Sequence, residues 1–98
     1  SMSNRTVNRN VARRWSVSRE AKSHNGQLST DGRNLYSYNQ LIGIALKDGT
    51  KVVLEYRSTK GGHYISQTTS THVGYAAHEA NLTMTPDAAK EADLIRRV

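Results

Sequence analysis

Hydrophobic and polar residues alternate most clearly in the middle of the 98-residue chain. Residues 51–56 (KVVLEY) repeat with the period of two that a half-buried strand shows. Residues 35–46 (LYSYNQLIGIAL) and 63–67 (HYISQ) are also rich in strand-forming side chains. Asp48-Gly49 and Lys60-Gly61-Gly62 supply turns between these segments. The pattern predicts an antiparallel meander of consecutive hairpins.

The C-terminal third has helical patterns instead. Residues 72–81 (HVGYAAHEAN) place small apolar side chains on one face, after several Ser and Thr candidates for the N-cap at 68–71. A second helix starts at Thr85-Pro86, with Thr as N-cap and Pro at the first helical position. We therefore expect an α+β fold: a three- to four-stranded antiparallel sheet with one or two C-terminal helices packed on one face. The expected core positions are Leu35, Leu41, Ile42, Ile44, Val52, Leu54, Ile65, Val73, Ala77, Leu94 and Ile95.

The N-terminal segment has little that would fill a core. Val7, Val11 and Trp15 have helical spacing, but the asparagines between them are poor helix formers, and a helix this short is marginal alone. Residues 1–14 are predicted to be a flexible basic arm that becomes helical on a partner. Residues 15–98 are predicted to form a single α+β domain. The stretch 23–34 reads as turns, with Asn25-Gly26 and Asp31-Gly32.

Positive charge is concentrated at the N-terminus. The formal net charge is +6, and residues 1–22 carry most of it, with six Arg and Lys against Glu20. Guanidinium groups pair with phosphates, asparagine bonds base edges, and an indole stacks on an exposed base. The alternatives are a solvated terminus that maintains solubility, or an arm that contacts an acidic protein surface. The predicted nucleic-acid-binding residues are Arg5, Arg9, Arg13, Arg14, Trp15, Arg19 and Lys22.

The tyrosines allow a second interpretation of the same chemistry. Tyr36 and Tyr38 share one face of a strand by period two, and Tyr56 and Tyr64 fall on neighbouring segments. If exposed beside Lys51, Arg57 and Lys60, these rings would form a stacking platform for single strands. In a chain without Phe, the favoured interpretation is that tyrosines belong to the core and its rim.

Several classes of function have no basis in the sequence. The chain lacks cysteine, which excludes disulfides, thiolate nucleophiles and sulfur-bound zinc. His24, His63, His72 and His78 lack metal-ligand spacing, and no nucleophile elbow or phosphate-binding loop is present. We expect a non-enzymatic protein with no catalytic residue, metal or cofactor. No apolar run approaches the ~20 residues of a membrane span, so a soluble, cytoplasmic protein without membrane contact is expected.

Two blocks of sequence carry a resemblance to a known family. Ser29-Thr30-Asp31-Gly32, Leu35-Tyr36-Ser37-Tyr38, Ile42-Gly43 and the segment TTSTH at 68–72 resemble a pattern in small uncharacterised proteins of bacteriophages and bacterial mobile elements. The resemblance covers about residues 23–75. It implies a phage origin and a role in host takeover or counter-defence, and it assigns no catalytic residue.

Three hypotheses for function follow. The first is a small phage-type protein that binds DNA or RNA through the basic arm. The alternative is an adaptor or inhibitor that binds a host protein, and the third is a structural component of a virion. Because only 36% of the residues are hydrophobic, a homodimer that completes the core is a further expectation.

Overall fold

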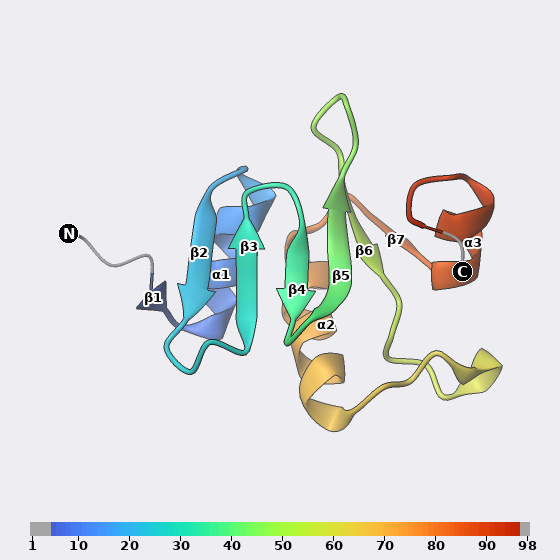
Figure 1. The fold of residues 1–98 in the computed structure, drawn as a ribbon, viewed down its shortest axis with the longest axis horizontal. Helices are drawn as coiled ribbons and strands as arrows, with labels where there is room; N and C mark the ends of the chain where they lie inside the picture. Colours follow the sequence, from blue (N-terminus) through green and yellow to red (C-terminus); the bar gives the residue numbers. More distant parts are fainter. Residues whose placement is uncertain (1–4, 97–98) are drawn as a thin grey trace.

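A seven-stranded mixed sheet with three α-helices forms the protein in a computed structural model that describes residues 5–96 (Figure 1). The strands are Arg5–Thr6 (β1), Glu20–Ser23 (β2), Leu28–Asp31 (β3), Leu35–Ser37 (β4), Gln40–Ala45 (β5), Lys51–Leu54 (β6) and Leu82–Met84 (β7). The helices are Asn8–Ser16 (α1), Gln67–Glu79 (α2) and Pro86–Glu91 (α3), with a 3-10 turn at Lys60–Gly62 (η1). Among these, no helix has the length and apolar character needed to cross a bilayer.

The strands lie across the sheet in sequence order. Strands β2 to β6 form an antiparallel meander. At the two ends, β1 is parallel to β2 and β7 is parallel to β6, so α1 and α2 are the crossovers of two β-α-β units. Both helices lie on the same face of the sheet and contact each other (Figure 1). The result is two layers, with α3 beyond β7 at the end of the sheet far from β1.

The expected three- to four-stranded antiparallel sheet is wrong, although the α+β class is correct. The predicted strand 35–46 is two strands, because Tyr38 adopts a φ of 56° and turns the chain between β4 and β5. Residues 23–34 were expected to form turns, but strands β2 and β3 lie on the two sides of Asn25-Gly26. Residues 63–67 form no strand, because Ser66 caps α2: its hydroxyl accepts a hydrogen bond from the Thr69 N–H.

The N-terminal segment is part of the fold from Arg5 onward. Residues 5–16, expected to be mostly a flexible arm, form β1 and α1 instead, while residues 1–4 of that arm lie outside the described residues. Val11, Ala12 and Trp15 of α1 are fully buried. The helical spacing of Val11 and Trp15 therefore marks a core-facing stripe, because packing against the sheet outweighs the weak helix propensity of the asparagines.

The main core lies between the sheet and the two long helices. Trp15 is at its centre: its ring is buried and its Nε1–H donates to the Arg33 carbonyl oxygen at 2.8 Å. The remaining buried members of this cluster are Val11, Ala21, Leu28, Leu35, Ile42, Val53, Val73 and Ala76. Of the expected core positions, Leu41, Ala77, Leu94 and Ile95 are only half-buried and Ile65 is exposed.

Gly43 in β5 lets the sheet approach the Trp15 ring. A Cβ at this position would lie 2.7 Å from Cζ2 of Trp15 and 3.0 Å from Cβ of Leu35. We expect Gly43→Ala to lower the free energy of unfolding by about 1–3 kcal/mol, since a packed core does not accept an added methyl group. Urea denaturation measures this change.

Gly74 in α2 provides the control for that substitution. No atom lies within 4 Å of a Cβ built there, and the residue is in a helix interior. We expect Gly74→Ala to stabilise the protein by up to about 1 kcal/mol. If Gly43→Ala were as stable as Gly74→Ala, the close packing of β5 against Trp15 would be contradicted.

Candidate nucleic-acid interface

The outer face of α1 carries an unbroken positive charge. Its sequence, NRNVARRWS, contains three arginines and no acidic residue. The apolar stripe turns inward, which leaves Arg9 and Arg13 exposed and Arg14 half-buried. Arg13 and Arg14 are in the last turn, where the carbonyl end of the helix dipole favours cations.

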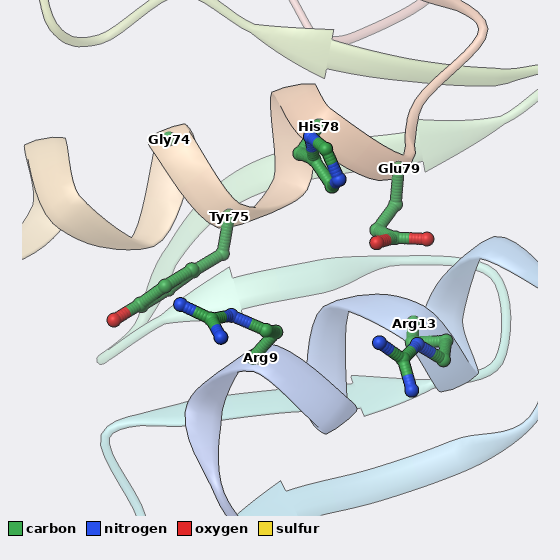
Figure 2. A pocket seen from close by; sticks show the side chains of 6 residues that line it. All are labelled: Arg9, Arg13, Gly74, Tyr75, His78 and Glu79. Carbon is green, nitrogen blue, oxygen red and sulfur yellow. The ribbon is translucent and has the colours of Figure 1, made fainter.

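Arg9 and Arg13 face α2 across a groove (Figure 2). The two arginines are four residues apart, so they lie on the same side of α1. Tyr75 and Glu79 are four residues apart and project from α2 toward the two arginines, and His78 also lines the groove. The groove has a volume of about 450 Å³ and is lined by Arg9, Arg13, Gly74, Tyr75, His78 and Glu79.

The Arg9 guanidinium lies over the Tyr75 ring. Its Cζ atom is 5.6 Å from the ring centroid, within the range of a cation–π contact. Gly74 leaves open space next to this pair, since nothing lies within 4 Å of a Cβ built there. The groove therefore combines two arginines, an aromatic ring and room beside it, which is chemistry suited to a phosphate and a stacked base.

The other predicted site residues lie elsewhere. Arg5 in β1 donates from Nη1 to the carbonyl oxygens of Ser23 at 3.0 Å and His24 at 3.3 Å, so it joins β1 to the following hairpin. Lys22 is the register partner of Arg5 and is exposed on the sheet face opposite the helices. Arg19 is exposed between α1 and β2. Of the predicted site residues, the structure brings together Arg9 and Arg13, which line the same groove, whereas Arg14 does not line it.

Trp15 is not available to stack on a base. Its side chain has no exposed surface, and its indole N–H is already bonded to the Arg33 carbonyl oxygen. The aromatic side chain that stands beside the arginines is Tyr75 instead. The sequence analysis did not predict Tyr75, His78 and Glu79 as site residues. The one sequence feature that could have indicated them is that they lie on α2 away from its buried, apolar side.

The alternative platform of tyrosines on the sheet does not form. Tyr38 is in the turn after β4 and its ring lies 6.3 Å from the His72 ring, centroid to centroid. Lys51, expected to be exposed, is buried and donates from Nζ to the Ser18 hydroxyl at 2.7 Å. Burial lowers the pKa of Lys51, and the nearby Arg33 charge lowers it further. Arg57 is paired with Glu55 at 2.6 Å.

A buried polar network joins α2 to the sheet. The Ser37 hydroxyl of β4 hydrogen-bonds to Nδ1 of His72 at 2.7 Å and to the Thr69 hydroxyl at 2.9 Å. All three side chains are buried, with Ser37 fully so, and none of them lines the groove that contains Arg9 and Arg13. These hydrogen bonds join β4 to α2 across the core, so the network fixes the position of α2 on the sheet.

His72 makes stability depend on pH. Burial lowers its pKa below the ordinary value of 6.5, so the folded protein holds the ring neutral. Its contribution to stability is complete above pH 6.5 and is lost as the pH falls through the lower folded pKa. We expect the free energy of unfolding to fall between pH 7 and pH 5. In this range hydrogen bonds that lower the pKa of Asp31 and Glu55 keep both ionised.

The variant His72→Asn isolates that effect. Asparagine retains a polar group near the position of Nδ1 but does not titrate, so the variant is expected to be less stable overall and to lose less stability on acidification. Urea denaturation at pH 7, 6 and 5 measures both quantities. Equal losses of stability in the variant and in the native protein would show that His72 does not couple folding to pH.

Comparisons with models of protein families, with curated proteins and with solved structures found no match to this chain. The resemblance to phage and mobile-element proteins therefore stays a prediction of the sequence. Within residues 5–96, no group of three or more His, Asp or Glu side chains is arranged to hold a metal ion.

Proposed function

We propose that the chain is a non-enzymatic protein that binds single-stranded nucleic acid on its helical layer. The observation that supports this proposal is the groove between α1 and α2, where Arg9 and Arg13 face an aromatic ring. The phosphates of a strand pair with the arginines of α1, and one base enters the groove against Tyr75. Base stacking of this kind needs an unpaired base, which favours a single strand over a duplex.

The basic surface belongs to a rigid helix instead of a mobile arm. The backbone of a folded helix is already ordered, so less conformational freedom is lost when a strand binds than with a mobile arm. Arg5 is bonded to backbone carbonyl oxygens, and Arg19 and Lys22 lie on other surfaces. We therefore assign the phosphate contacts to Arg9, Arg13 and Arg14. The predicted phage origin and the lack of cysteine support action in the host cytoplasm.

Fluorescence anisotropy tests the proposal. Labelled 12-nucleotide single-stranded DNA, the matching RNA and duplex DNA are titrated at 50 and 200 mM salt. With three phosphate contacts to a single strand, the slope of log affinity against log salt is expected to be about −2. Tighter binding of single strands than of the duplex supports the groove. No binding of any of the three at 50 mM salt contradicts the proposal and leaves a protein partner as the alternative.

A further inference from the structure

One residue of the groove has the wrong charge for a phosphate. Glu79 lies one helical turn beyond Tyr75 on the same side of α2, and its carboxylate projects toward the groove (Figure 2). Among residues 5–96 this carboxylate forms no salt bridge or hydrogen bond, although two arginines line the same groove. A carboxylate repels phosphate and only accepts hydrogen bonds, so this end of the groove favours a ligand with hydrogen-bond donors.

On the basis of the proposed function, we infer that the groove selects an unpaired guanine, with Glu79 as the residue that determines specificity. The Watson–Crick edge of guanine presents two adjacent donors, N1–H and the N2 amino group. They match the two oxygens of one carboxylate. Adenine, cytosine and thymine each present one donor group on this edge, next to an acceptor that a carboxylate repels. The edge is free only in an unpaired base.

Tyr75 and the open space beside it accommodate the base. A guanine whose edge contacts Glu79 lies along the groove, with its face against the Tyr75 ring. Arg9, now 5.6 Å from that ring, either covers the other face of the base or turns to the phosphate. The groove volume of about 450 Å³ is within the range of ligand sites, and Gly74 adds no side chain that would fill it.

Single-base changes in a uniform strand test this inference. The probe is a labelled 12-nucleotide thymidine strand whose central base is replaced by guanine, adenine, cytosine or hypoxanthine, which lacks the 2-amino group. The guanine strand is expected to bind about tenfold more tightly than the unsubstituted strand, in line with one bidentate contact to a base. The hypoxanthine strand is expected to lose most of that advantage. Adenine and cytosine are expected to give none.

Two variants connect the preference to the groove. Glu79→Gln is expected to abolish the preference for guanine and to bind the unsubstituted strand more tightly, because one negative charge is removed. Asp48→Asn removes the same charge from the distant β5–β6 turn and is expected to keep the preference. Gly74→Leu changes no charge and places a side chain in the groove, so it is also expected to abolish the preference.

The outcomes separate this inference from the function on which it rests. Equal binding of all the strands by the native protein overturns guanine selection but leaves single-strand binding intact. A preference for cytosine, or one that survives Glu79→Gln, also overturns it. No binding of any strand overturns both. If free GMP displaces the guanine strand at concentrations near that of the strand itself, the ligand is a free nucleotide and the inference of an unpaired base in a strand is wrong.

Discussion

Trp15→Ala is expected to lower the free energy of unfolding by about 3–5 kcal/mol, because the ring is fully buried among both helices and the sheet. A domain of this size is stable by only about 5–15 kcal/mol, so the variant is expected to be partly unfolded at 37 °C. The loss also leaves the Arg33 carbonyl oxygen without the indole donor. Urea denaturation followed by circular dichroism measures the change without depending on tryptophan fluorescence.

Val17→Ala is the matched control for that measurement. Val17 directly follows α1 and is 61% exposed, so its truncation is expected to change stability by less than about 0.5 kcal/mol. Deletion of residues 1–14 removes β1 and most of α1, including the buried Val11 and Ala12, so it is expected to unfold the protein. A free basic arm, in contrast, would be removed without effect. A deletion variant with an unchanged thermal melt would show that β1 and α1 are not part of the folded domain.

The second large effect is expected on nucleic-acid binding. Arg9→Gln combined with Arg13→Gln removes the two cations that line the groove. Each charged hydrogen bond contributes about 1.5 kcal/mol or more, so affinity for a 12-nucleotide single strand is expected to fall about 100-fold at low salt. The salt slope is expected to become less negative by about 1.5, since two phosphate contacts are lost.

A variant with the same loss of charge distinguishes a site from general attraction. Lys22→Gln combined with Lys47→Gln also removes two exposed cations, one on the opposite sheet face and one in the β5–β6 turn. This variant is expected to weaken binding only a few-fold through the net charge. If both double variants lose the same affinity, binding depends on net charge alone and the groove is not the site.

Local sequence signals predicted the parts of the fold that depend on neighbouring residues. The helix start at Thr85-Pro86 is confirmed: the Thr85 hydroxyl accepts from the Ala88 N–H, and Pro86 is the first helical residue. The hairpin at Asp48-Gly49 is confirmed as well, since β5 and β6 pair on either side of it. Capping and turn chemistry involve only a few adjacent residues, so they are visible without the fold.

Long-range packing explains what the sequence did not predict. The role of Val11 and Trp15 depends on the sheet against which they pack, and that sheet is formed by residues much later in the chain. Tyr38 adopts a positive φ that is unusual for a bulky side chain, so the weakness of the strand pattern at Asn39-Gln40 did not by itself predict the turn between β4 and β5.

The candidate site was predicted only in part, because contacts between distant segments of the chain complete it. The N-terminal clustering of arginines indicated Arg9, Arg13 and Arg14 from charge alone. Their partners Tyr75 and Glu79 are more than sixty residues away, and only the contact of α1 with α2 brings them near. Arg5 and Trp15 belong to the same basic segment, but their side chains serve the fold instead.

Mapping a bound oligonucleotide by NMR tests the central proposal most directly. A 12-nucleotide single strand is titrated into ¹⁵N-labelled protein, and shifts of the backbone amides are assigned to residues. If the strand binds in the groove, the largest shifts are expected along α1 from Arg9 to Ser16 and on α2 from Gly74 to Glu79. Shifts confined to the opposite face of the sheet, around Lys22 and Tyr36, or no shifts at low salt, would contradict it.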